Sequence, residues 1–308
     1  MAVVHVEVQD LVGILTLDDP ERRNCLSVEM LQGLTAGLAR LADAKVRVVI
    51  LRAPPGATVW SAGLDVRSLP EPGRDPLDYQ DPLEQVIRQV EHFPAPVIAM
   101  VEGGVWGGAC DLSFVCDLAI GCETASFAIT PAKLGVPYNC SGILHFLNLV
   151  GPRVAGEMFF TAEPIKAERA VAVGILNRLV PKGELEAHTL ALARRIAQNS
   201  PLAVGVIKEQ LRILGRSHPV YPETFERIQA LRRCVFESAD YVEGKKAFLE
   251  KRRPVFTGDG APAPSGGGRS PELRGVQGGA DASHRTGPPT RHEHRSVEEE
   301  GGGVLGTR

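Results

Sequence analysis

The chain has 308 residues, of which 44% are hydrophobic and 23% are charged, a composition typical of a soluble globular enzyme. Its net charge of −3 provides no general field that attracts polyanions, so we expect no nucleic-acid partner. All apolar stretches fall well short of the roughly 20 residues needed to cross a bilayer, so we expect no membrane partner either.

In chain order, the first two hundred residues alternate between short strands and helices. Apolar alternation predicts strands at residues 3–8, 13–17, 46–52, 97–101, 118–121 and 126–130. A first helix follows Ser27, which suits an N-cap, and carries leucines at helical spacing from Leu31 to Leu41. A second helix presents one apolar face made of Leu83, Val86, Ile87 and Val90.

From Ser200 onward the pattern changes to three helices, each with a start signal. The signals are Ser200-Pro201, Tyr221-Pro222 and Ser238 followed by acidic residues. From residue 258 the chain loses its apolar periodicity, and Gly, Pro, Arg and Ser dominate. We therefore predict a core with the active site at 1–199, a helical region at 200–257 and a disordered low-complexity tail at 258–308.

The six cysteines and the first residues indicate the compartment. The cysteines lie mostly inside apolar segments, form no CxxC pair and have no histidine at metal-ligand spacing. They are predicted to be reduced core thiols, as in a reducing compartment. The chain begins directly with an alternating strand, without a basic or apolar leader, so a cytoplasmic location is predicted.

Two glycine-bearing segments, 60–65 and 101–111, follow apolar strands and lead towards helices. Neither fits a nucleotide-binding loop, because the GxGxxG spacing and the GK[ST] ending are both missing. Gly108 opens a helix, so its amide lacks an intrahelical acceptor and suits an anionic oxygen. If the amide of Leu64 faces the same point, the two form an oxyanion hole. The alternative is close packing of strand against helix through the glycines.

Five motifs within residues 1–257 resemble the enoyl-CoA hydratase/isomerase (crotonase) superfamily. They are Asn24-Cys25-Leu26-Ser27, Ser61-Ala62-Gly63-Leu64-Asp65, Ile98-Ala99-Met100-Val101-Glu102-Gly103, Gly107-Gly108-Ala109 and Cys116-Asp117-Leu118. The resemblance implies an α/β fold, a crotonase-like superhelix of ββα turns. It also implies that the helices of 200–257 form a C-terminal oligomerisation layer, which builds a homotrimer or, from paired trimers, a homohexamer.

In that superfamily two backbone amides hold a thioester carbonyl and so stabilise an enolate. The resemblance places these amides at Leu64 and Gly108. It places coenzyme A, as part of the substrate, against Thr130, against Lys251 reaching from a neighbouring subunit, and against the backbone of Ala62, Gly63, Leu64, Asp65 and Val66. The alternative for Lys251 is a solvated cationic helix end.

Asp111 is a candidate catalytic carboxylate. Hydratases of the superfamily carry one glutamate at this position and a second in a P-E-x-x-L-G element. This chain has Asp111, one methylene shorter, and Thr130-Pro131-Ala132-Lys133-Leu134-Gly135, which lacks the second glutamate. Hydration by two carboxylates is therefore not expected. The alternative for Asp111 is a charge that favours the start of a helix. His145 stands in no motif and reads as a surface or packed histidine.

The segment Leu134-Gly135-Val136-Pro137-Tyr138-Asn139 is similar to that of the superfamily's decarboxylating subgroup, which acts on methylmalonyl-CoA. By this resemblance Tyr138 hydrogen-bonds the departing carboxylate, and the alternative is a core tyrosine.

Trp106 is a candidate for a water-excluding wall of the site, or else packs in the core. The subgroup has His where this chain has Leu64. A backbone donor survives that change, whereas any contribution of an imidazole does not.

The expected function is decarboxylation of methylmalonyl-CoA, or a related malonyl-CoA thioester, to propionyl-CoA by a carbon–carbon lyase. An enolate held by backbone amides needs no metal, biotin or pyridoxal, so no separate cofactor is expected. Two alternatives remain open: an enoyl-CoA hydratase or isomerase, and a non-catalytic protein of the same fold that binds acyl-CoA or RNA. The missing glutamate argues against the first, and the acidic net charge argues against RNA.

Overall fold

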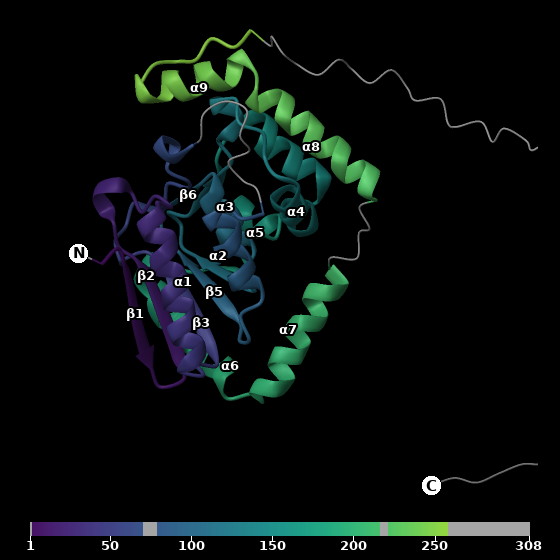
Figure 1. Ribbon diagram of the computed structural model, residues 1–308. Coiled ribbons are helices and arrows are strands. Elements are labelled where there is room, and N and C mark those ends of the chain that lie inside the picture. The colour runs from purple at the N-terminus through teal and green to yellow at the C-terminus, as the bar shows by residue number, and fades with distance from the viewer. Residues whose placement is uncertain (1, 70–78, 216–220, 258–308) are drawn as a thin grey trace, which may run out of the picture. The chain divides into compact units, whose positions relative to one another are not determined.

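A computed structural model describes residues 2–69, 79–215 and 221–257 (Figure 1). The chain divides into two compact units, Met1–Ala263 and Pro264–Arg308, and the second lies wholly outside the described residues. The tail predicted at 258–308 also lies outside them.

The first unit begins with an antiparallel hairpin and a helix, as predicted. Strand β1 (Val4–Gln9) pairs with β2 (Val12–Leu17), and helix α1 (Val28–Asp43) follows. Ser27 caps α1, because its hydroxyl accepts a hydrogen bond from the amide of Met30 at 3.2 Å. The leucine face of α1 is buried and lies over the β1–β2–β3 end of the sheet (Figure 1).

A six-stranded sheet runs in the order β1-β2-β3-β5-β7-β10. Beyond the hairpin its neighbours are parallel, from β3 (Val48–Arg52) and β5 (Val97–Val101) to β7 (Leu118–Gly121) and β10 (Arg178–Leu179). Strand β3 begins two residues later than predicted, because the amide of Val46 bonds to the carbonyl of Leu41 and closes the end of α1. Apolar side chains cover both faces, as parallel strands require.

A smaller sheet contains β4 (Val59–Ser61), β6 (Gly104–Trp106), β8 (Ser126–Ala128) and β9 (Ile165–Lys166). The chain passes from the large sheet to the small one three times, from β3 to β4, β5 to β6 and β7 to β8. A helix follows each passage: α2 (Pro82–Glu91), α3 (Gly108–Phe114) and α4 (Cys140–Thr161). This repeat is the predicted superhelix of ββα turns. Strand β8 is shorter than predicted, because a 3-10 helix begins at Pro131.

The remaining helices cover the sheets and extend the chain. Helix α5 (Ala167–Ala172) follows β9, and α6 (Leu185–Ala197) packs against the face of the large sheet opposite α1. Three further helices start at the predicted signals: α7 (Pro201–Gly215), α8 (Pro222–Phe236) and α9 (Ala239–Leu249). Among the described residues, no helix combines the length and the apolarity needed to cross a membrane.

Candidate active site

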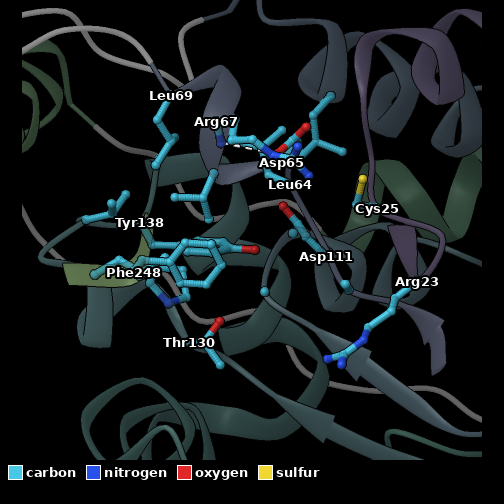
Figure 2. Close-up of a pocket in the computed structure, with 18 of the residues that line it drawn as sticks. Arg23, Cys25, Leu64, Asp65, Arg67, Leu69, Asp111, Thr130, Tyr138 and Phe248 are labelled. Carbon is cyan, nitrogen blue, oxygen red and sulfur yellow. Dashed lines mark hydrogen bonds and ion pairs between the residues drawn. The ribbon is translucent and has the colours of Figure 1, made fainter. Parts of the chain in front are cut away.

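A cavity of about 290 Å³ lies where the segments after β4, β6 and β8 meet the start of α2 and helix α9 (Figure 2). Its lining contains eight of the predicted site residues, which are Ala62, Leu64, Asp65, Val66, Gly108, Asp111, Thr130 and Tyr138. The fold therefore brings residues separated by more than seventy positions in sequence around one space.

The glycine loop after β4 approaches the start of α3 very closely. Gly63 has φ of +80°, and a Cβ placed on it would lie 2.3 Å from the carbonyl oxygen of Trp106 and 3.1 Å from the amide nitrogen of Gly108. Only glycine fits there without displacing backbone. The motif at 24–27 holds this loop in place, since the Leu26 amide donates to the Gly63 carbonyl at 2.8 Å.

The amides of Leu64 and Gly108 lie side by side at the cavity. The position of a Cβ on Gly108 would be 3.7 Å from the amide nitrogen of Leu64. Within the part of the chain that the structure describes, neither amide donates to a protein acceptor. Two neighbouring backbone donors without acceptors suit a single anionic oxygen.

Tyr138 points into the same cavity from the segment before α4 (Figure 2). Its ring packs edge-on against Phe146 and Phe159, with centroids 5.7 and 5.1 Å away. Its hydroxyl has no hydrogen-bond partner among the described residues, unlike that of a satisfied core tyrosine. Burial, followed by the negative charge of Asp111, raises its pKa well above the ordinary value, so the hydroxyl remains a neutral donor.

Asp111 lies in the first turn of α3, and only 2% of its surface is exposed. Its Oδ1 lies 2.7 Å from Nδ1 of His145 on α4, and Nε2 of His145 lies 3.2 Å from Oε1 of Glu91 on α2. Burial by itself lowers the pKa of His145, but the hydrogen bond and charge of Asp111 outweigh it and raise the pKa. His145 therefore holds a proton more readily than a free histidine does, and it belongs to the site. Sequence analysis missed it because no motif surrounds it.

Glu84, near the start of α2, adds a second buried carboxylate to the lining. It accepts hydrogen bonds from the amide of Asn139 and, at 3.0 Å, from the hydroxyl of Ser141. Burial and the charge of Asp111 raise its pKa, against the effect of these two hydrogen bonds. Sequence analysis missed Glu84, because it lies outside the expected glutamate motif and beside an apolar helix face.

Basic residues line the cavity on the side of the glycine loop. Arg22, Arg23 and Arg67 all belong to the lining. Arg22 donates to Asp65 at 2.6 Å, and Nε of Arg67 lies 3.4 Å from the same carboxylate. These arginines suit a phosphate-bearing ligand. The pair Arg22-Arg23 directly before the motif at 24–27 was the sequence signal for them.

Three predicted site residues lie outside the lining. Gly63 forms the close backbone contact described above. The indole of Trp106 lies against Gly104, where an added Cβ would come within 2.3 Å of the ring. Lys251 is exposed just after α9, whereas Phe248 of that helix does line the cavity.

The arrangement can hold one anionic oxygen on two amides, orient a second polar group with a neutral hydroxyl and exchange a proton with a buried acid. A thioester with a negatively charged acyl group has the matching set of features.

Comparison with known proteins also points to enzymes that act on coenzyme A thioesters. A family model described as enoyl-CoA hydratase/isomerase matches residues 7–259. The chain is 47% identical over 255 residues to methylmalonyl-CoA decarboxylase of Escherichia coli (strain K12), covering 83% of this chain and 98% of that protein. It is 33% identical over 255 residues to the human mitochondrial enoyl-CoA hydratase domain-containing protein 3, covering 80% of this chain and 81% of that protein.

A solved structure of methylmalonyl-CoA decarboxylase in complex with 2-nitronate-propionyl-CoA has a TM-score of 0.81 to this chain. The two sequences are 47% identical, and the match covers 83% of this chain and 98% of that one. The family match at residues 7–259 includes all the residues that line the cavity.

Proposed function

The chain belongs to the enoyl-CoA hydratase/isomerase family, as its motifs predicted, and from this membership we propose that it decarboxylates methylmalonyl-CoA, or a related malonyl-CoA thioester, to propionyl-CoA. The observation that carries the proposal is the position of Tyr138. Its hydroxyl faces the same cavity as the amides of Leu64 and Gly108, and among the described residues all three groups lack a protein hydrogen-bond partner. The similarity to methylmalonyl-CoA decarboxylase of Escherichia coli supports the same reaction.

In the proposed mechanism the two amides form an oxyanion hole for the thioester oxygen. The carbon–carbon bond to the carboxylate breaks when it lies across the thioester plane, because its electron pair then delocalises into the carbonyl. Each amide contributes roughly 3 to 4 kcal/mol by stabilising the enolate oxygen. Since the thioester itself accepts the electrons, the reaction requires no separate cofactor.

Tyr138 is proposed to hold the carboxylate in the reactive orientation. A neutral phenol donates a hydrogen bond that fixes the carboxylate without neutralising its charge, so the electron pair of the breaking bond can pass into the thioester as neutral CO2 leaves. The neighbouring carboxylates Glu84 and Asp111 favour the same outcome, since a third buried negative charge close to them is unfavourable and CO2 is neutral.

Coenzyme A is proposed to enter along the glycine loop. The lining arginines Arg22, Arg23 and Arg67 suit its phosphates. Thr130 lies close to the start of α3, with its hydroxyl 3.6 Å from where a Cβ on Gly107 would be. Lys251 is proposed to reach the nucleotide of a neighbouring subunit, which its exposure after α9 allows.

A second function, hydration or isomerisation of an enoyl-CoA, is favoured by one observation. Glu84 and Asp111 both line the cavity, and paired carboxylates are the groups that activate and deliver water. The contacts of Glu84 with Asn139 and Ser141 occupy both of its oxygens, which argues against its use as a base.

One experiment separates the two functions. Purified protein is incubated with methylmalonyl-CoA, malonyl-CoA and crotonyl-CoA, and the thioester products are followed by mass spectrometry. Loss of 44 mass units (about the mass of CO2) from the first substrate supports decarboxylation. A gain of water on crotonyl-CoA with no CO2 released would overturn it.

We further propose that the protein assembles as a homotrimer or homohexamer in the cytoplasm. Helix α7 exposes Leu202, Leu211 and Leu214 by 81%, 68% and 71%, more apolar surface than a monomer normally shows on one helix. All six cysteines are free thiols, which suits a reducing compartment. Analytical ultracentrifugation tests the assembly, and a purely monomeric species would contradict it.

A further inference from the structure

The proposed decarboxylation consumes one proton in each turnover. Loss of CO2 breaks the carbon–carbon bond and leaves its electron pair on the α-carbon, shared with the thioester oxygen as an enolate. A proton must then bond to the α-carbon to give the acyl-CoA product. The enzyme therefore needs an acid that touches this carbon while the oxygen is held by the two amides.

Several ionisable residues of the cavity are unsuited to this task. Tyr138 orients the carboxylate, and burial raises its pKa. Asp65 is held by Arg22 and Arg67. Burial also raises the pKa of the Cys25 thiol. Leu64 has no ionisable group and cannot act as an acid. The decarboxylating subgroup that this sequence resembles has histidine at the same position.

We propose that the hydrogen-bonded pair of Asp111 and His145 supplies this proton, with Asp111 as the group that touches the α-carbon and His145 as its positioning residue. The inference rests on the proposed function, because it assumes that an enolate forms in this cavity. It assigns a role to His145, which no sequence motif marked.

Geometry supports Asp111 as the donor. It lies three residues after Gly108, so its side chain projects from the same first turn of α3 whose amide faces the thioester oxygen. Its Oδ1 is occupied by Nδ1 of His145 at 2.7 Å. Among the described residues, the hydrogen bond of the Asp111 carboxylate is to Oδ1, which leaves Oδ2 for the cavity that Asp111 lines.

The surroundings of His145 keep a proton on the pair. Its side chain is 11% exposed, and its Nε2 lies 3.2 Å from Oε1 of Glu91 while its Nδ1 lies 2.7 Å from Oδ1 of Asp111. Both ring nitrogens therefore face carboxylates, an arrangement that favours the imidazolium form. The charged groups facing His145 are Asp111 on α3, Glu84 and Glu91 on α2 and, across a neighbouring cavity, Asp117, Lys208 and Arg212.

The step balances within the pair. The proton on Nδ1 of His145 passes to Oδ1 of Asp111, and the carboxyl group turns so that this O–H bond faces the cavity. The O–H bond then breaks as the proton bonds to the α-carbon. The electron pair of the enolate forms the new C–H bond. Asp111 is left as a carboxylate beside a neutral imidazole, and the pair regains one proton from water after the product leaves.

The test follows this proton directly. In deuterium oxide the reverse of the protonation step exchanges the α-hydrogens of propionyl-CoA for deuterium, which mass spectrometry detects without any decarboxylation. Asp111→Asn should lower the exchange rate at least about 100-fold, the usual size of a general-acid effect. Its affinity for propionyl-CoA should change less than threefold (about 0.6 kcal/mol).

His145→Gln keeps a hydrogen-bond donor for Asp111 but carries no exchangeable charge. It should slow exchange about tenfold and flatten the dependence of the rate on pH, which a purely structural residue would not do. His92→Asn is the matched control, since His92 is an exposed histidine at the end of α2, outside the cavity lining, with its Nδ1 2.8 Å from the carbonyl of Arg88. That variant should exchange like the unmodified protein.

A second measurement separates this inference from the proposed function. Methylmalonyl-CoA decarboxylated in deuterium oxide should give one enantiomer of 2-deuteriopropionyl-CoA with the unmodified protein, and both with Asp111→Asn. If CO2 is released but Asp111→Asn still exchanges and still gives one enantiomer, the pair is not the donor. If no CO2 is released at all, the proposed function fails, and the exchange rates alone decide whether the pair acts as an acid.

Discussion

Nζ of Lys208 lies 2.7 Å from Oδ2 of Asp117 and joins helix α7 to the residue that precedes strand β7. The ammonium also donates to the carbonyls of Val90 and Ala95, at 3.2 and 3.1 Å. All three of its protons are used, although only 8% of the side chain is exposed. Removing one partner of a buried ion pair whose hydrogen bonds are all satisfied lowers the free energy of unfolding substantially.

Lys208→Met should therefore lower the free energy of unfolding by about 2 to 4 kcal/mol, because Asp117 loses its cationic partner and two buried carbonyls lose the hydrogen bonds of the ammonium. Chemical denaturation followed by circular dichroism measures the change. Lys246→Met is the control, since Lys246 is exposed on α9 and its loss should cost less than about 0.5 kcal/mol. Equal effects of the two substitutions would show that the Lys208 contacts do not stabilise the fold.

The raised pKa of His145 makes stability depend on pH with a definite sign. A pKa that is higher in the folded chain means that folding binds protons, so the stabilisation is complete below the unfolded value of about 6.5. It is lost as the pH rises through the folded pKa. The difference in unfolding free energy between the unmodified protein and His145→Asn should shrink from pH 6 to pH 9. A difference that grows over this range would contradict the pKa direction.

Two substitutions of Gly108 separate the role of its backbone amide from the effect of an added side chain. Gly108→Pro and Gly108→Ala both add a Cβ, which would meet the flexible end of Leu83 at 2.8 Å, but only proline removes the N–H. If the amide holds the enolate oxygen, turnover should fall roughly 100- to 1000-fold further in Gly108→Pro than in Gly108→Ala. The rates are compared only after both variants show cooperative thermal unfolding.

Much of this fold follows from local patterns. Strands β5 and β7 begin and end where sequence analysis placed them, because apolar runs stop at glycine or polar residues there. Helix α3 begins at Gly108, as predicted. The start of β3 was misplaced because Val46 is apolar but bonds to the end of α1. Periodicity cannot distinguish an apolar residue in a strand from one that closes a helix.

The site was only partly predictable. Motif resemblance pointed to Leu64, Gly108 and Tyr138, and the structure places all three around one cavity. Glu84 and His145 were not identified, because their partners lie on other helices: Asn139 for Glu84 and Asp111 for His145. Contacts between α2, α3 and α4 depend on how the helices pack, and no spacing along the chain records them.

Lys251→Ala tests the proposed contact with coenzyme A. A phosphate contact far from the reacting carbon binds ground state and transition state alike, so KM should rise several-fold with little change in kcat. Arg253→Ala, two residues further along the same exposed segment, is the matched control. If both substitutions leave KM unchanged, Lys251 is only a solvated cation at the end of a helix.

Tyr138→Phe tests the choice between decarboxylation and hydration. The substitution keeps the ring packed against Phe146 and Phe159 and removes only the hydroxyl. If that hydroxyl orients the carboxylate, kcat on methylmalonyl-CoA should fall about tenfold to a thousandfold. Affinity for propionyl-CoA, which has no carboxylate, should hardly change. Tyr79→Phe, an exposed tyrosine outside the cavity, should leave both quantities unaltered.

Substitution of the cavity carboxylate Glu84 should give the opposite result to Tyr138→Phe. Hydration depends on acid–base groups and not on a carboxylate orienter, so a hydratase would tolerate Tyr138→Phe but lose activity on crotonyl-CoA in Glu84→Gln. A decarboxylase should show the reverse order, because Glu84 touches no reacting atom in that mechanism and its amide replacement still bonds to Ser141. If Glu84→Gln abolishes turnover while Tyr138→Phe leaves it intact, the hydroxyl is not the orienting group and the paired carboxylates must perform the chemistry.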